Sequence, residues 1–162
     1  MQNIYSMNKA KKGWLAFMLL FCGLFANTLT AQQVFTWNGS SDNNWANAAN
    51  WDVSGTGSTS TYPGQDSVTK TDKVVINNGS VANAPIISTT VPNAIDNLLI
   101  SNATAPAPTL TINNGATLTV TSAANNPVTI NGANIVNNGI LDIKTTITGA
   151  VAAGISCGAP AV

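Results

Sequence analysis

The stretch that decides the fold is 109–120, Thr-Leu-Thr-Ile-Asn-Asn-Gly-Ala-Thr-Leu-Thr-Val. In each of its two halves apolar residues alternate with threonine, which is the period of a β-strand with one buried face. Similar short β-branched runs recur from residue 72 onward, and sustained helical spacing is missing beyond the first 31 residues. We therefore predict an all-β fold. The expected strands are 74–76, 85–88, 98–100, 109–112, 117–120, 128–130, 140–143 and 146–148.

The word Asn-Asn-Gly separates such runs at 77–79, 113–115 and 137–139. Asn-Gly between alternating runs is typical of a β-hairpin, and a three-residue loop would pair Leu110 with Leu118 on one buried face. In a β-solenoid each strand pairs instead with its counterpart one coil away, and Asn can take a left-handed conformation at the corners. Repeats of roughly 20 to 25 residues would give about five coils. The pattern fits both arrangements.

The first 31 residues have the pattern of a secretory leader. Three lysines at 9–12 precede an apolar run at 14–26, which is shorter than the about 20 apolar residues that a membrane-spanning helix needs. We predict a helical signal peptide cleaved after Ala31, so that the mature chain is extracellular or at the cell surface and does not insert into the membrane. Cys22 raises a lipoprotein alternative, which the bulky Phe21 before it disfavours.

Charge and residue types exclude several functions. The six basic residues are all lysine, the six acidic residues are all aspartate, and the chain has no His, Arg or Glu. Imidazole-based catalysis, histidine metal ligands and arginine anion clamps are therefore excluded. Removal of the leader takes three lysines and no aspartate, which leaves the mature chain with a net charge of −3. A weakly acidic protein is a poor candidate for binding nucleic acid, and we expect no cofactor.

The mature part resembles a known module. The segments that carry the resemblance are Thr-Trp-Asn-Gly at 36–39, Trp45, Ala-Asn-Trp at 49–51, and the strand-like stretches 72–76, 84–87, 97–100 and 108–120. Together they resemble the N-terminal module of large secreted bacterial surface proteins, which are adhesin-like and commonly exported by the type IX route. The resemblance implies a right-handed parallel β-helix with an N-terminal aromatic cap. An antiparallel β-sandwich is the alternative that the hairpin interpretation keeps open.

The resemblance also implies a structural or adhesive module that acts by surface contact and not by catalysis, with surface glycans or matrix proteins as partners. We divide the chain into the signal peptide at 1–31, a tryptophan-rich cap and loop at 32–71, and solenoid coils at 72–162. Asp66-Ser67-Val68 is similar to a short O-glycosylation motif of the same bacterial group, which makes Ser67 a candidate site. Relatives continue into further repeats and a sorting domain, so we expect part of a longer adhesin or a short relative with another anchor.

Trp37, Trp45 and Trp51 are the candidate functional side chains. Three flat rings within fifteen residues could stack on sugar rings, with neighbouring Asn side chains binding hydroxyls, as in a carbohydrate-binding module. The other interpretation is a cap over the open end of the solenoid, since an uncovered terminal coil exposes apolar core and unpaired backbone. We favour the cap, because repeat folds need one.

Aspartates are the remaining side chains that could take part in catalysis or bind a metal. Asp72, Asp96 and Asp142 lie in the repeating zone or at its start, and nothing in the sequence places two of them at the separation that a glycoside hydrolase needs. We therefore expect no catalytic residue, and a partial polysaccharide-active enzyme is the least favoured alternative. Asp42-Asn43-Asn44 lacks the spacing of a calcium loop and predicts a turn, so no metal site is expected. Cys157, the one cysteine of the mature chain, is expected to be a free thiol or to pair between molecules.

Overall fold

The computed structural model describes residues 32–55, 60–66, 72–101, 106–122, 127–145 and 155–158, with the backbone alone for 145 and 155–158. The chain divides into two compact units, Met1–Thr30 and Ala31–Val162, and every described residue lies in the second. The predicted signal peptide, its cleavage site after Ala31 and the predicted strand 146–148 lie outside the described residues.

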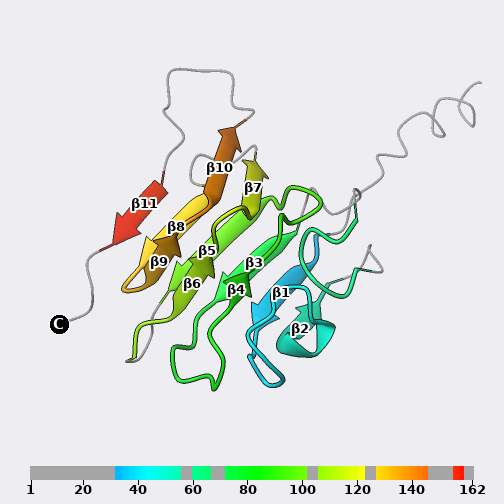
Figure 1. Ribbon diagram of the computed structural model, residues 1–162, viewed down its shortest axis with the longest axis vertical. Helices are drawn as coiled ribbons and strands as arrows, with labels where there is room; N and C mark the ends of the chain where they lie inside the picture. The colour runs from blue at the N-terminus through cyan, green and yellow to red at the C-terminus, as the bar shows by residue number, and fades with distance from the viewer. Residues whose placement is uncertain are drawn as a thin grey trace, which may run out of the picture. The chain divides into compact units, whose positions relative to one another are not determined.

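Three sheets contain the described strands (Figure 1). The six-stranded sheet has the order β11-β8-β5-β3-β1-β2, the three-stranded sheet has the order β4-β6-β9, and the two-stranded sheet pairs β10 with β7. A short 3-10 turn, η1 at Ala48–Asn50, precedes β2. This content confirms the all-β class. The strands are β1 Val34–Trp37, β2 Trp51–Ser54, β3 Lys73–Ile76, β4 Ile86–Ile87, β5 Asn97–Ser101, β6 Thr109–Ile112, β7 Thr117–Ser122, β8 Val128–Asn131, β9 Asn134–Asn137, β10 Ile140–Thr145 and β11 Ile155–Gly158.

The chain visits the three sheets in a repeating order. Strands β5, β6 and β7 belong in turn to the six-, three- and two-stranded sheets, and β8, β9 and β10 repeat that passage, which we call a circuit. Strands of successive circuits pair in parallel: Ile112 of β6 lies beside Ile87 of β4 and Asn137 of β9, each 25 residues away. Among the described pairs, antiparallel pairing is confined to β1 and β2. These pairings do not support the antiparallel sandwich.

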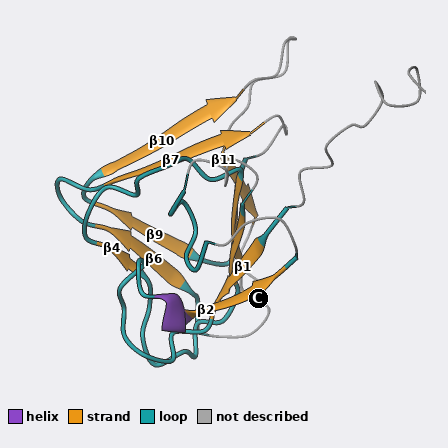
Figure 2. Cartoon of the chain, turned by 90° about the vertical axis from the view of Figure 1, so that its right-hand side faces the viewer, coloured by secondary structure: helices purple, strands orange, loops and turns teal. Residues whose placement is uncertain are grey.

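Alternation along the strands sorts side chains to the inside and outside of the sheets. In β6 and β7 the leucine, isoleucine and valine residues are buried, whereas the threonines are partly exposed. Because parallel pairing keeps the register, inward residues stack: Val74 lies beside Leu98, and Leu98 beside Val128. Figure 2 shows the strands of the three sheets around a common interior. Each fully buried leucine there stabilises the fold by about 2 kcal/mol, so one stacked core holds the sheets together.

The segment 113–116 is a corner between sheets. Ala116 N–H donates to the C=O of Asn113 at 3.1 Å, and Gly115 has φ +79°. No described residue other than glycine has a positive φ, so Asn114 does not adopt the type I′ turn of a two-residue hairpin. The observed pattern is that of a type II turn. Strands β6 and β7 enter different sheets, and the hairpin interpretation is wrong.

The Asn-Asn-Gly words do not mark one position of the repeat. The word at 77–79 leads from the six-stranded to the three-stranded sheet, whereas those at 113–115 and 137–139 lead from the three-stranded to the two-stranded sheet. The expectation of left-handed asparagines is also wrong for the described residues, where glycine takes every positive φ. Asparagine instead links circuits through its side chain: Asn113 Nδ2 donates to Ser88 Oγ at 3.4 Å.

Seven predicted strands correspond to β3 through β8 and β10. Strand β9 escapes prediction because its Ile-Val pair stands between asparagines, which strands disfavour, and it is held by parallel pairing with β6. Strands β1 and β2 lie in the segment predicted as a cap, yet both belong to the six-stranded sheet, since β1 pairs with β3 as well as with β2. The cap and the repeating zone therefore share one sheet.

Candidate functional site

The tryptophan cluster, which consists of Phe35, Trp37, Trp45 and Trp51, lies at the start of the path through the sheets. Phe35 and Trp37 are the buried residues of β1, and Trp51 begins β2. The antiparallel register places Trp37 beside Trp51. A bridge between the residue before Trp45 and β4 positions the third tryptophan. The structure thus brings together the three tryptophans that the sequence singles out.

Trp51 is the centre of this cluster. Its ring centroid lies 4.8 Å from that of Trp37 and 4.9 Å from that of Trp45, with interplanar angles of 82° and 78°. Phe35 meets it at 6.2 Å and 88°. Edge-to-face contact is a favoured geometry for aromatic rings, and each such pair contributes about 0.5–1.5 kcal/mol beyond the burial of its surface. The cluster is therefore a closely packed body.

Each indole N–H of the cluster has a backbone acceptor. Trp51 Nε1 donates to the C=O of Trp45 at 2.7 Å. Trp45 Nε1 donates to the C=O of Pro63 at 3.1 Å, and Trp37 Nε1 donates to the C=O of Asn83 at 2.8 Å. Pro63 and Asn83 come from two loops remote in sequence, so the cluster ties both loops to β1 and β2.

The same packing removes the ring faces from solvent. The exposed fractions of Trp37, Trp45 and Trp51 are 2%, 3% and 5%. A sugar-stacking platform needs at least one aromatic face open to the ligand, and these rings pack on one another and on the core. Their burial leaves no ring face open for sugar stacking and so disfavours the carbohydrate-binding interpretation of these three residues, while the cap stays a prediction with which the packing is consistent.

A network of Asp and Asn side chains shapes the loop between β1 and β2. Asp42 Oδ1 accepts from the N–H of Asn44 at 2.8 Å and from Asn50 Nδ2 at 2.6 Å, and Oδ2 accepts from Asn47 Nδ2 at 2.9 Å. Asn50 is fully buried, and its Oδ1 accepts from the N–H groups of Ser41 and Asp42, both at 3.0 Å. The turn predicted at this place is confirmed. Short polar side chains supply the partners that the loop backbone needs.

Hydrogen bonds from Asn47 and Asn50 hold the pKa of the Asp42 carboxyl below its ordinary value of 3.8, and the N–H of Asn44 acts in the same direction. Both carboxylate oxygens are engaged within the loop. In the described part of the chain, no group of three or more His, Cys, Asp or Glu side chains could hold a metal ion. No local feature distinguishes Asn50 from the other asparagines, because its role depends on the loop closing around it.

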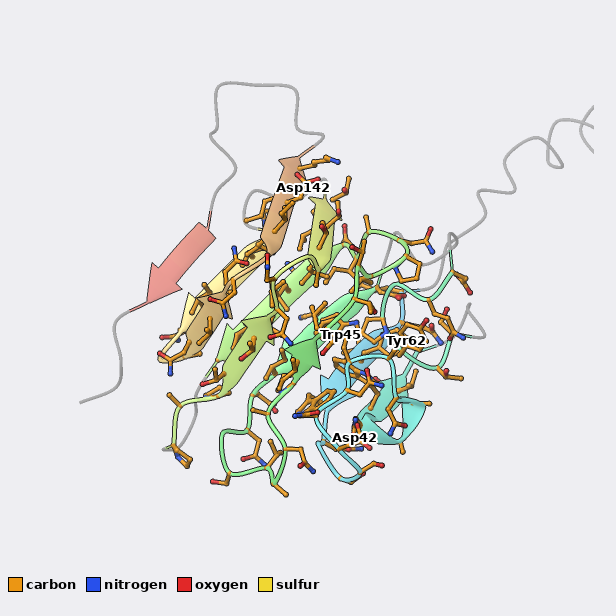
Figure 3. All side chains as sticks on the ribbon, in the orientation of Figure 1. Asp42, Trp45, Tyr62 and Asp142 are labelled. Atoms are coloured by element: carbon orange, nitrogen blue, oxygen red, sulfur yellow. The ribbon has the colours of Figure 1, made fainter. Side chains whose placement is uncertain are left out.

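Two small hollows lie on the described surface. One, of about 90 Å³, is lined by Trp45, Tyr62 and 87–92, and Figure 3 shows Trp45 and Tyr62 close together. The other, of about 130 Å³, lies among Ile76, Val81 and 107–109. Ligand pockets typically measure about 300–1,000 Å³, so neither hollow encloses a ligand of that size.

The aspartates considered for catalysis have structural partners. Asp142 of β10, labelled in Figure 3, forms an ion pair with Lys144 at 2.8 Å. Backbone pairing brings Asp72 and Asp96 to neighbouring positions, since Asp96 N–H donates to the C=O of Asp72 at 2.9 Å. Asp72 is buried, and Asp96 accepts a hydrogen bond from Gln32 Nε2 at 3.4 Å. None of the three lines either hollow.

Threonines line the outward faces of two sheets. We call them the outer threonines: Thr109 and Thr111 of β6, and Thr117, Thr119 and Thr121 of β7. All five are partly exposed. A threonine hydroxyl can both donate and accept hydrogen bonds, and its methyl group can contact apolar atoms. These faces are therefore polar without being charged.

Two residues that the sequence singles out are not placed. Ser67 lies outside the described residues, as does the side chain of Cys157, whose backbone is in β11. Within the ranges that the structure describes, no helix is long and apolar enough to cross a membrane.

Comparisons with models of protein families, with curated proteins and with solved structures found no match. The tryptophan cluster and the outer threonines are therefore the features from which a function can be inferred.

Proposed function

We propose that this protein is an exported surface module of the adhesin-like kind, which acts by contact and not by catalysis. The residues behind the resemblance support this proposal, because Trp37, Trp45 and Trp51 pack against one another in three dimensions. The asparagines beside them, Asn38 and Asn50, are joined through a backbone hydrogen bond of 2.9 Å. Export is supported by the leader pattern at 1–31.

The fold within this proposal is a right-handed parallel β-helix, closed at its N-terminal end by the tryptophan cluster. Its support is the repeating passage through three sheets with parallel, in-register pairing. A stack of strands needs a cap, since a terminal strand would otherwise expose apolar core and unpaired backbone. Strand β2 supplies such a cover by pairing antiparallel with β1.

The observation that carries the contact mechanism is the set of outer threonines. They present hydroxyl and methyl groups on two sheets, beside hollows too small to enclose a ligand. Such faces suit hydroxyl-rich partners, such as surface glycans or matrix proteins, through many weak contacts. Many copies on one surface would add those contacts, because linked weak sites gain avidity without any new interaction.

The test uses residues 32–162, which lie in a single compact unit. Beads carrying this protein are exposed to a panel of glycans and matrix proteins. The double variant Thr111→Glu and Thr117→Glu places a charge on each threonine-bearing sheet, and we expect it to bind roughly ten-fold more weakly. The matched control is the double variant Ser80→Glu and Ala82→Glu, which adds the same two charges at exposed loop positions and should bind as the unmodified protein does.

Circular dichroism of each variant verifies that it is folded. Equal loss of binding in the control would show that added charge, and not the outer threonines, is responsible. An unmodified protein that binds no member of the panel contradicts the contact function. Export is tested separately, by whether the mass of the secreted chain corresponds to Gln32 as its first residue.

A further inference from the structure

Strand β10 is an edge strand in the described part of the chain, because β7 is its one neighbour. The N–H of Ile140 donates to the C=O of Ala116, next to β7, at 2.9 Å. Backbone groups of successive strand residues point to opposite sides, so the N–H and C=O groups of Leu141 and Ile143 point away from β7, toward the free edge. Such a row is a template for pairing with another strand.

The sheets lose burial at this end. The exposed fractions of Val136 and Ile140 are 45% and 58%. Leu141 and Ile143 face inward but are partly exposed, whereas their partners one circuit earlier, such as Leu118, are fully buried. Covering this end would therefore remove apolar surface from water.

The charges of β10 favour one particular partner. Asp142 and Lys144 lie on the outward face, one on each side of Ile143. If a second copy pairs antiparallel about Ile143, each Asp142 lies opposite the Lys144 of the other copy. Ile143 then exchanges both backbone hydrogen bonds with its counterpart, and the charged residues occupy the non-hydrogen-bonded positions, where side chains are closest. Opposite charges at facing positions stabilise antiparallel pairs, and like charges destabilise them.

We propose that the chain forms a two-fold symmetric dimer through antiparallel pairing of β10 with β10 of a second copy. At the other end of the stack β2 is also the last strand of its sheet, but its one charged residue is Asp52, so a second copy pairing there would find no lysine to face it. Figure 1 shows β2 and β10 on opposite sides of the described strands. Pairing of like edges closes a dimer, whereas pairing of unlike ends would build a filament.

Charge variants test this dimer. Sedimentation velocity on residues 32–162 should show a dimer that dissociates on dilution. Asp142→Lys places two lysines opposite each other, and Lys144→Asp places two aspartates opposite each other, so we expect either variant to dimerise roughly ten-fold or more weakly. The exchanged double variant, Asp142→Lys with Lys144→Asp, should dimerise as the unmodified chain does.

A mixture of the two single variants separates the dimer contact from the ion pair within one chain. Each variant lacks that internal pair, yet together they restore opposite charges across the interface, so native mass spectrometry should detect the mixed dimer in preference to either like pair. If a charge reversal prevents folding, Asp142→Asn and Lys144→Gln carry the same test with a smaller effect. A monomeric unmodified chain, or single variants that dimerise normally, would overturn the proposal.

Discussion

Replacing Trp51 with alanine tests the cap most directly. The ring is 5% exposed and stands at the centre of three edge-to-face contacts. Removing a tryptophan from a packed core costs about 3–5 kcal/mol, which already includes lost burial and the cavity. The lost indole N–H also leaves the C=O of Trp45 without this donor, which costs about 1 kcal/mol more.

The expected decrease in the free energy of unfolding is therefore about 4–6 kcal/mol, out of the roughly 5–15 kcal/mol that folded domains typically possess. Urea unfolding followed by far-ultraviolet circular dichroism measures it without relying on tryptophan emission. With a denaturant dependence of about 2 kcal/mol per molar, the midpoint should fall by about 2–3 M.

Two control variants are compared with Trp51→Ala. Trp51→Phe keeps a ring but lacks the N–H, and it should lose about 1–2 kcal/mol. Val53→Ala lies two residues along the same strand at 44% exposure, and it should change stability by no more than about 0.5 kcal/mol. A Trp51→Ala protein that loses less than about 1 kcal/mol, or no more than the Val53 variant, would refute the cap.

Two further predictions concern the loop beside the cluster. Because hydrogen bonds lower the folded-state pKa of Asp42, its contribution to stability is fully present above the unfolded-state pKa and is lost as the pH falls through the folded-state pKa. Asp42→Asn should therefore be less stable than the unmodified protein at about pH 7, and the difference should shrink as the pH falls below the ordinary Asp value of 3.8. Urea unfolding across this pH range measures the difference, and a constant difference would contradict the prediction. Gly39 has φ +54°, and an added Cβ would collide with the C=O of Asn83, whereas Gly115 has φ +79° and nothing within 4 Å of that position. Gly39→Ala should therefore lower the free energy of unfolding by roughly 2–4 kcal/mol and Gly115→Ala by about 1 kcal/mol. Thermal or urea unfolding measures both losses, and equal losses would contradict the prediction.

The strands could be predicted from the sequence because the alternation of apolar and polar residues shows which side chains face the inside of a sheet. The alternation in 109–120 predicts β6 with its observed bounds and β7 to within two residues. Strand pairing is different, since it joins residues about 25 positions apart. The choice between a hairpin and a stack depended on the backbone at Asn114 and Gly115, where both turn types suit an Asn-Gly pair. The φ values exclude the two-residue hairpin loop, and the parallel pairing of β6 and β7 within two different sheets excludes the hairpin altogether.

In the candidate site, too, the sequence predicts which residues matter but not how remote segments pack around them. Residue type and spacing are sufficient to single out Trp37, Trp45 and Trp51, but they fit both an exposed platform and a buried cap. The difference lies in the burial of the rings, which depends on contacts with remote segments such as the carbonyls of Pro63 and Asn83, and no spacing rule connects these to the tryptophans. Likewise, the burial of Asn50 follows from loop closure and not from its sequence neighbours.

Burial of the inward side chains decreases from one circuit of the stack to the next. Ile100, Leu110 and Leu118 are fully buried, whereas Ile130, Ile135 and Leu141, which lie beside them one circuit later, are only partly buried. The apolar side chains are therefore fully buried in the earlier circuit, and the end with β10 has apolar surface still to cover. A dimer through β10 would cover that surface and place two sets of outer threonines on one particle. Because avidity rises with the number of linked sites and not with the strength of each, the self-association proposed for one end would strengthen the contact function proposed for the faces.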